Sequence, residues 1–247
     1  MKKYAIILAA GKGTRMKTDL PKCAFPFCGK PMITYIVDNL KNSGIDEIVT
    51  IIGYKGEVIK DCLKDQVKYA YQLEQLGTGH ATKCAKEVLK DKHGLTLIFP
   101  GDMPLIDETH INGLINKHIN DNNDLTVLTT ILDDPASYGR IKRENGKVKK
   151  IVEFKDCTEE EKQIKEINVA LYAIDNQLLF DTLDKIQNNN NQHEYYLTDI
   201  VEILGSDKEN NYKVDTYVCK NDYRLTGIND QETLKKTEEE YLKNKLK

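Results

Sequence analysis

The stretch from Leu8 to Met16, LAAGKGTRM, constrains the fold most, because an apolar run ends there and glycines and basic residues follow. An apolar segment such as 4–10 that stops at glycine is typical of a buried parallel strand. A glycine-rich segment after such a strand lets backbone N–H groups approach and bind phosphates. The stretch therefore predicts a phosphate-binding loop at the carboxyl end of the first strand.

Two better-known phosphate loops do not match this segment. The dinucleotide fingerprint needs a third glycine where Met16 stands, and the Walker loop needs glycine four residues ahead of Gly-Lys-Ser/Thr. The loop instead has four basic side chains and one acidic side chain, a local charge of +3: Lys12, Arg15, Lys17 and Lys22 with Asp19. Such a charge attracts a triphosphate. The alternative is a surface loop with incidental lysines.

Composition narrows the class of partner. The 36 basic and 39 acidic residues nearly balance, which argues against a nucleic-acid-binding or membrane-surface protein. The six cysteines form no Cys-x-x-Cys pair, so neither a zinc knuckle nor a disulfide framework is indicated. No apolar stretch approaches the roughly 20 residues that span a bilayer, and the apolar N-terminal segment is better explained as a strand than as a signal peptide. We expect a cytoplasmic protein with small-molecule ligands.

The first half of the chain alternates strand and helix patterns. Strands are predicted at 47–52, 67–71, 95–99 and 125–132, and helices at 31–42, 57–63, 81–89 and 108–116. Alternation with short connections predicts a mostly parallel sheet covered by helices on both faces. We expect one domain over residues 1–247.

The pattern changes after the strand at 125–132. Asn145-Gly146 is the strongest short hairpin signal in the chain, so an antiparallel insertion is predicted over about 138–170. A strand over 166–174 would carry Asn168 back to the main sheet. Helices at 178–186, 200–204 and 231–245 and a strand at 212–219 complete the prediction.

Two more polar loops follow strands. The segment 72–81 comes after the third strand, and Asp102 comes after the fourth. In open α/β sheets the carboxyl ends of the strands line the ligand crevice, so both loops should face the first one. A single aspartate suffices for Mg²⁺, which takes one or two protein ligands besides water and phosphate oxygens. The alternative for Thr78 and for Asp102 is that each caps the helix that follows.

The motifs LAAGKGTRM, LPK, QLGTGHA, GDMPL, YGRI, IVEFKD, EIN, EYYLTD and GIND occur in this order from Leu8 to about Asn229. Together they resemble the sugar-nucleotide pyrophosphorylases. Within that family they are most similar to the uridylyltransferase half of the bifunctional bacterial enzyme that makes UDP-N-acetylglucosamine. The resemblance implies a Rossmann-like α/β nucleotidyltransferase fold with a small antiparallel sugar-binding insertion.

The resemblance also implies roles for particular residues. Arg15 and Lys22 would act in catalysis, and Asp102 and Asn229 would hold Mg²⁺. The nucleotide would be bound by Leu8, Ala9, Ala10, Gly11, Gly13, Gln72, Gly77, Thr78 and Gly101. The amino-sugar phosphate would be bound by Gly139, Glu153 and Asn168.

The implied reaction converts UTP and N-acetylglucosamine 1-phosphate into UDP-N-acetylglucosamine and pyrophosphate. The sugar phosphate oxygen attacks the α-phosphorus in line and is already ionised, so no general base is required. Catalysis then consists of positioning and charge stabilisation. We expect a monomer or a weak homo-oligomer, with no nucleic-acid or membrane partner.

Three departures from the family pattern bear on the substrate. Val169-Ala170 stands where members commonly have Thr-Gly, Pro100 stands where an aromatic residue is common, and the acetyltransferase half lies outside this sequence. The alternatives are a thymidylyl- or cytidylyltransferase, since the amide of Gln72 can turn to pair with uracil or cytosine. A non-catalytic nucleotide-binding module is a further alternative.

Overall fold

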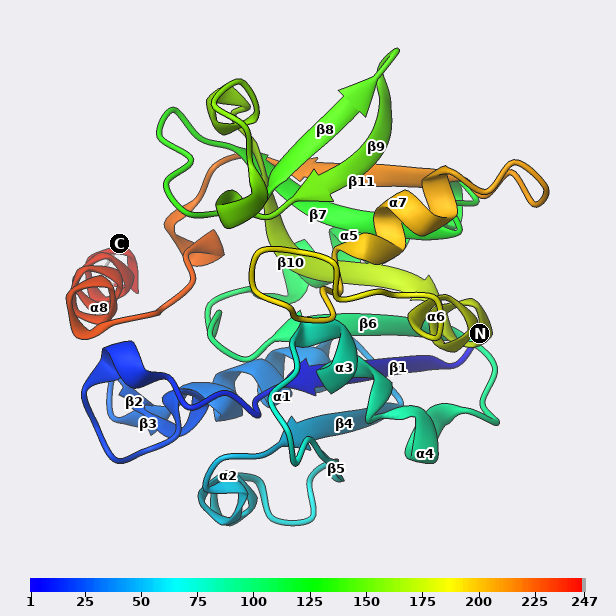
Figure 1. The fold of residues 1–247 in the computed structure, drawn as a ribbon. Coiled ribbons are helices and arrows are strands. Elements are labelled where there is room, and N and C mark those ends of the chain that lie inside the picture. Colours follow the sequence, from blue (N-terminus) through cyan, green and yellow to red (C-terminus); the bar gives the residue numbers. More distant parts are fainter. Residues whose placement is uncertain (246–247) are drawn as a thin grey trace.

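A nine-stranded sheet forms the centre of the computed structural model, which describes residues 1–245 (Figure 1). Its main path runs β11 (Val214–Cys219), β7 (Leu125–Ile131), β10 (Glu166–Asp175), β6 (Leu95–Pro100), β1 (Lys3–Leu8), β4 (Glu47–Ile52) and β5 (Lys68–Tyr71). Neighbouring strands are parallel except β10, which is antiparallel to β6 and β7. The prediction of a mostly parallel sheet is confirmed.

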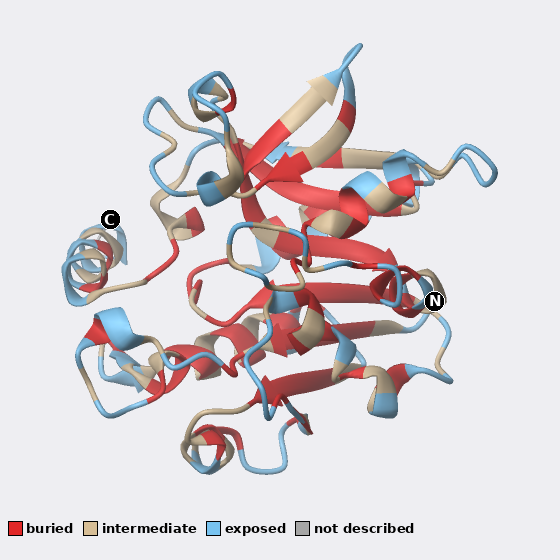
Figure 2. Cartoon of the chain, viewed as in Figure 1, coloured by how far each residue is buried: buried red, intermediate tan, exposed pale blue. Residues whose placement is uncertain are grey.

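Side chains of β1 alternate between the two faces of the sheet. Ala5 and Ile7 join one apolar cluster, whereas Tyr4 and Ile6 join the other. The first cluster includes residues of α1 (Met32–Asn42), α2 (Gly56–Leu63) and α5 (Glu108–Asn120). The second includes residues of α3 (Thr78–Lys83), α4 (Lys86–Leu89), α6 (Asn176–Leu183) and α7 (Asp199–Gly205). Helices therefore cover both faces, and the strands between them are buried (Figure 2).

The predicted hairpin is present as β8 (Arg140–Glu144) and β9 (Lys147–Val152). Asn145 and Gly146 both have positive φ, 50° and 78°, as a two-residue hairpin turn requires. The hairpin attaches to the main sheet through β8 and β10. Further along β10 the register with β7 shifts between Asn168 and Tyr172, and Ala170 in that bulge has φ 62°.

The predicted helix over 81–89 is wrong in its bounds. It forms two helices, α3 and α4, and the first begins at Thr78 because Gly77, at φ 107°, turns the chain directly into it. Thr78 is not the cap: its hydroxyl accepts a hydrogen bond from the Leu197 N–H at 3.0 Å. Asp102 is not a cap either, since the side chain of Asp107 caps α5.

Other bounds also differ from the prediction, and one element was missed. Helix α5 continues to Asn120, and α6 begins at Asn176 because Asp175 caps it. A small hairpin, β2 (Pro26–Phe27) with β3 (Lys30–Pro31), was not predicted.

The C-terminal helix α8 (Gln231–Lys245) lies beside β2 and β3 (Figure 1). Its Tyr241 ring packs edge-on against Phe27 at 5.4 Å between centroids, and Leu234 joins a third apolar cluster with Met16 and Ile228. This cluster fixes the segment before α8 against the loop that follows β1. No helix within the described residues is long and apolar enough to cross a bilayer.

Candidate functional site

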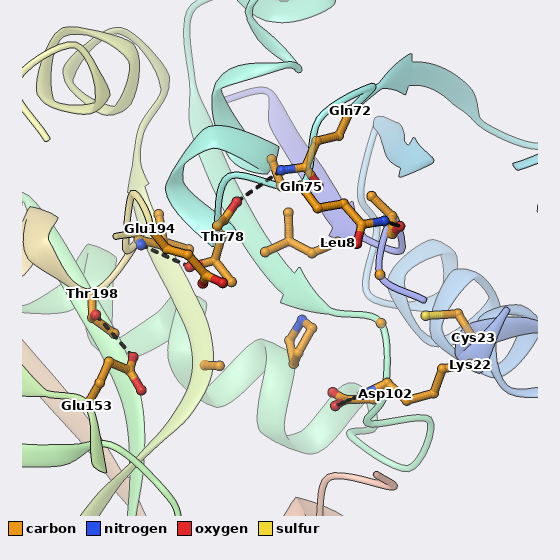
Figure 3. Close-up of a pocket in the computed structure, with 18 of the residues that line it drawn as sticks. Leu8, Lys22, Cys23, Gln72, Gln75, Thr78, Asp102, Glu153, Glu194 and Thr198 are labelled. Atoms are coloured by element: carbon orange, nitrogen blue, oxygen red, sulfur yellow. Dashed lines mark hydrogen bonds and ion pairs between the residues drawn. The ribbon is translucent and has the colours of Figure 1, made fainter. Parts of the chain in front are cut away.

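A cavity of about 400 Å³ lies at the carboxyl ends of β1, β5 and β6. Eleven residues predicted for the site line it: Leu8, Ala10, Gly11, Lys22, Gln72, Gly77, Thr78, Gly101, Asp102, Glu153 and Asn168. Figure 3 shows Lys22 and Asp102 at one end of the cavity and Glu153 with Thr198 at the other. The structure thus brings the three strand-end loops and the insertion to one cavity.

Four charged or amide side chains from three distant segments meet at the first end, which we call the charged end. Lys22 Nζ lies 2.6 Å from Asp102 Oδ2 and 3.1 Å from Asn229 Oδ1. The Arg15 guanidinium donates to the same Asn229 oxygen at 3.0 Å. Arg15 and Asn229 do not line the cavity themselves but join it through Lys22.

Backbone contacts place these side chains. The Ile228 N–H donates to the Asp102 carbonyl at 2.8 Å, which brings the segment before α8 against the loop after β6. A Cβ on Gly13, which has φ 62°, would lie 2.5 Å from Lys22 Cβ, so glycine leaves the space that the lysine stem occupies. Ala9 does not line the cavity either, because its side chain is in the core.

The charged end fits a divalent cation such as Mg²⁺. A carboxylate oxygen of Asp102 and an amide oxygen of Asn229 both contact the Lys22 ammonium. Two protein oxygens are therefore already directed at one positive charge. Mg²⁺ prefers such oxygen ligands and keeps other positions for water and phosphate. Among residues 1–245 no three His, Cys, Asp or Glu side chains are grouped to hold a metal, so any Mg²⁺ here would also need ligands from substrate and water.

The loop after β5 forms one wall of the cavity. Gln75 Nε2 donates to the Ala10 carbonyl at 2.9 Å and so ties this loop to the loop after β1. A Cβ on Gly77 would lie 2.6 Å from the Tyr195 carbonyl oxygen, which explains the glycine there. Gln72 also lines the cavity and is only 4% exposed, and its Nε2 donates to the Gly77 carbonyl oxygen of this loop at 3.1 Å.

The other end of the cavity holds Glu153 and Asn168, which the motif resemblance assigns to the amino-sugar phosphate, and for that reason we call it the sugar end. Thr198 Oγ1 donates to Glu153 at 3.1 Å, and Asn168 Nδ2 donates to the Tyr172 hydroxyl at 2.7 Å. The Asn168 carbonyl oxygen accepts from the Ala170 N–H at 2.8 Å. Gly139 stands behind the lining residues, where its carbonyl accepts from the Asn168 N–H at 2.9 Å.

Burial raises the pKa of Glu153, and the neighbouring Asp156 and Glu194 raise it further, although the Thr198 hydrogen bond opposes this. Burial, with help from nearby carboxylates, also raises the pKa of Asp199 to about 6. Burial raises the pKa of the Tyr172 hydroxyl, which keeps it neutral. The sugar end therefore disfavours negative charge, in contrast to the charged end.

Several lining residues were missed by sequence reasoning. They are Cys23, Gln75, Ala81, Tyr172, Glu194, Leu197 and Thr198, with Pro100 and Ala170 noticed only as departures from the family pattern. Glu194 and Thr198 belong to the motif EYYLTD, and Gln75 belongs to the loop around QLGTGHA, so the motifs marked the segments without assigning the side chains. Cys23 gave no signal; burial raises the pKa of its thiol to about 12.

Comparisons with known proteins agree with this architecture. The profile of the nucleotidyl transferase family matches residues 4–219. Two curated relatives, each named bifunctional protein GlmU, come from Acholeplasma laidlawii and Clostridium beijerinckii; they are 47% and 49% identical over 96% and 100% of this chain. The chain spans about half of their length, 51% and 53%.

A solved structure of UDP-glucose pyrophosphorylase complexed with UDP-glucose has the same fold. It aligns with a TM-score of 0.78 over 99% of this chain and 100% of that chain, at 19% identity. This likeness confirms the nucleotidyltransferase type of α/β fold.

Proposed function

This chain is a member of the nucleotidyl transferase family, and on that premise we propose that it transfers UMP from UTP to N-acetylglucosamine 1-phosphate. One observation carries the proposal. Arg15, Lys22, Asp102 and Asn229 meet at one end of a cavity whose wall holds Gln72 and whose other end holds Glu153 and Asn168. The groups that we assign to phosphate, base and sugar thus share one space.

The charged end would bind the triphosphate. Lys22 and Arg15 supply two positive charges, and the loop that includes Ala10 and Gly11 lines the adjoining cavity. A Cβ on Gly11 would contact nothing within 4 Å, so protein packing does not require this glycine. We assign it to the close approach of phosphate to backbone N–H groups.

Asp102 and Asn229 would hold Mg²⁺. When bound, Mg²⁺ neutralises charge on the phosphate oxygens. Lys22 pairs with Asp102 in this structure, so we expect the lysine to turn toward the phosphates when substrate binds. Lys22 then stabilises the charge that develops on the leaving pyrophosphate.

The reaction needs no protein nucleophile and no general base. The second pKa of a phosphate monoester is about 6, so the sugar phosphate is mostly a dianion at neutral pH. One of its oxygens forms a bond to the α-phosphorus, and the bond from that phosphorus to the bridging oxygen breaks with its electron pair leaving on pyrophosphate. The Cys23 thiol, although it lines the cavity, has its pKa raised to about 12 by burial and stays protonated.

The sugar end would bind the acceptor. Glu153 and Asn168 are held in place by Thr198 and Tyr172, and they present oxygen and nitrogen groups to sugar hydroxyls and the acetamido group. The Ala170 methyl group lines the same end. The motif resemblance and the GlmU relatives support an amino-sugar phosphate as the acceptor.

We further propose that the chain acts as one domain with the sugar-binding insertion over about 138–170. The two ends of the cavity come from segments that share one sheet, which supports a single unit. We also propose that it works in the reducing cytoplasm, which agrees with its six free thiols, and that it acts as a monomer or a weak homo-oligomer.

Pyrophosphate release tests the proposal. The protein is incubated with Mg²⁺, one nucleoside triphosphate at a time, and either N-acetylglucosamine, glucose or glucosamine 1-phosphate. We expect the highest kcat/KM for UTP with N-acetylglucosamine 1-phosphate. A higher value for dTTP or CTP would make the chain a different nucleotidyltransferase, and no release with any pair would leave a nucleotide-binding module.

A further inference from the structure

The side-chain amide nitrogen of Gln72 lies between a backbone carbonyl oxygen and a ring nitrogen of histidine. Its Nε2 lies 3.1 Å from the Gly77 carbonyl oxygen and 3.1 Å from Nδ1 of His80. Gln72 is almost fully buried, so water does not compete freely for these contacts. The amide therefore has a partner for each of its two N–H groups.

This arrangement fixes which amide atom a ligand meets. A carbonyl oxygen such as that of Gly77 can only accept, and Nδ1 of a neutral histidine accepts when the ring hydrogen is on Nε2. Turning the amide over would place the Gln72 oxygen against both acceptors, which is repulsive. Because Nε2 is engaged, the oxygen of Gln72 is the atom left for a base in the cavity that Gln72 lines.

We propose that His80 is a positioning residue that sets base selectivity by holding Gln72 with its oxygen toward the base. This inference rests on the proposed function and deepens it. Uracil and thymine carry a hydrogen on N3 and can donate to that oxygen, whereas N3 of cytosine is an acceptor and is repelled. A site built to hydrogen-bond one edge rejects the wrong partner strongly.

The placement of His80 separates this role from direct substrate contact. His80 does not line the substrate cavity; it lines the groove on the other side of the loop, with Leu76, Lys83 and Tyr195. Its backbone carbonyl accepts from the Cys84 N–H within the helical segment. A change of the His80 side chain can therefore reach the base only through Gln72.

Two matched variants test the role. In His80→Asn the side-chain oxygen takes the place of Nδ1 and restores an acceptor, whereas in His80→Leu a methyl group stands there. Both variants lose the outer half of the ring equally. The measurement is kcat/KM for UTP and for CTP with N-acetylglucosamine 1-phosphate, and the readout is their ratio.

We expect His80→Leu to lower the UTP-to-CTP ratio by about tenfold, the scale of one lost hydrogen bond to the amide, and His80→Asn to stay within about threefold of the unmodified protein. If His80→Leu does not give a native circular dichroism spectrum, His80→Val replaces it, because its methyl groups also remove the acceptor.

An unchanged ratio in the Leu or Val variant would overturn the inference, as would an equal loss in the Asn and Leu variants, since that indicates packing alone. An unmodified protein that does not prefer UTP over CTP would instead contradict the proposed function. The two failures are therefore distinguishable.

Discussion

The charged end and the sugar end of the cavity are held together in different ways. At the charged end, Lys22 bonds Asp102 and Asn229, which are 80 and 207 positions away, and Arg15 bonds Asn229 over 214 positions. At the sugar end, Asn168 bonds Tyr172 and Ala170, which are four and two positions away. The charged end depends on tertiary folding, whereas much of the sugar end is set within one bulged strand.

Charge differs between the two ends as well. The side chains of Lys22 and Asp102 are about one-fifth exposed and neutralise one another. Glu153 lines the sugar end and Asp199 lies near enough to feel its charge; neither pairs with a basic side chain of residues 1–245, and burial raises the pKa values of both. Changes at the charged end should therefore act mainly on turnover, and changes at the sugar end on substrate affinity and on the pH dependence of stability.

The largest effect is expected for Asp102→Asn, which removes the charge that would hold Mg²⁺. The variant should lose about 10²–10³ in kcat, the scale of one lost electrostatic group at a reacting centre. Pyrophosphate release at saturating Mg²⁺ measures it. The control Asp19→Asn removes one negative charge from the exposed loop nearby, and it should change kcat by less than about threefold. Equal losses in both variants would mean that only net charge matters.

Lys22→Met should reduce kcat by about 10², because charged hydrogen bonds contribute about 1.5–3 kcal/mol. The half-saturating Mg²⁺ concentration should fall at the same time, since the lysine no longer pairs with Asp102. Lys12→Met is the matched control, as Lys12 is exposed in the same loop. If the Lys12 variant loses as much activity, the loop acts through its total positive charge rather than through a specific contact of Lys22.

Glu153→Gln tests whether the sugar end acts on the sugar phosphate separately from UTP. The amide keeps an acceptor for the Thr198 hydroxyl but lacks the carboxylate charge. We expect KM for the sugar phosphate to rise about tenfold, as for one weakened hydrogen bond, while KM for UTP changes less than about threefold. Steady-state kinetics with each substrate varied in turn measures both values. Equal changes in the two values would contradict the division of the cavity.

The smallest effect is a pH-dependent gain in stability from Asp199→Asn. The pKa of Asp199 is raised from its ordinary 3.8 to about 6, so the folded state binds its proton more tightly than the unfolded state. The resulting stabilisation is present below about pH 4 and is lost as pH rises through about 6. Asn carries no charge, so the variant should exceed the unmodified protein in free energy of unfolding at pH 8 but not at pH 4.

Asp121→Asn provides a control of opposite sign. Lys117 lowers the pKa of Asp121 by a hydrogen bond, so this carboxylate stabilises the folded state above its ordinary pKa. Its replacement should lower the free energy of unfolding at pH 8 and have less effect at low pH. Urea unfolding at the two pH values measures both variants. The same sign for both would contradict the pKa assignments.

The order of secondary structure could be predicted from the sequence because local signals agree with it. The apolar run before Gly11 became β1, and Asn145-Gly146 became the hairpin turn. The predicted ends of helices were wrong where a contact with a distant segment determines them. Threonine is a residue type that often caps helices, yet the Thr78 hydroxyl accepts a hydrogen bond from the Leu197 N–H. No local sequence pattern reveals that contact.

The site was predictable to the level of segments. Because the carboxyl ends of parallel strands line one crevice, Gln72 and Asp102 were expected to lie together, and the motif resemblance added Asn229. Which lysine of the basic loop reaches that crevice depends on the turn at Gly13, and a charge count treats Lys12 and Lys22 alike. His80 could not be assigned from sequence because its role depends on one hydrogen bond formed after folding.

A competition among nucleoside triphosphates tests the proposed uridylyltransferase activity most directly. The protein is given Mg²⁺, N-acetylglucosamine 1-phosphate and an equimolar mixture of UTP, CTP, dTTP, ATP and GTP, and the nucleotide sugar formed is identified by mass spectrometry. We expect UDP-N-acetylglucosamine as the main product, with one pyrophosphate released for each molecule formed. A main product with another base, or no nucleotide sugar at all, would contradict it.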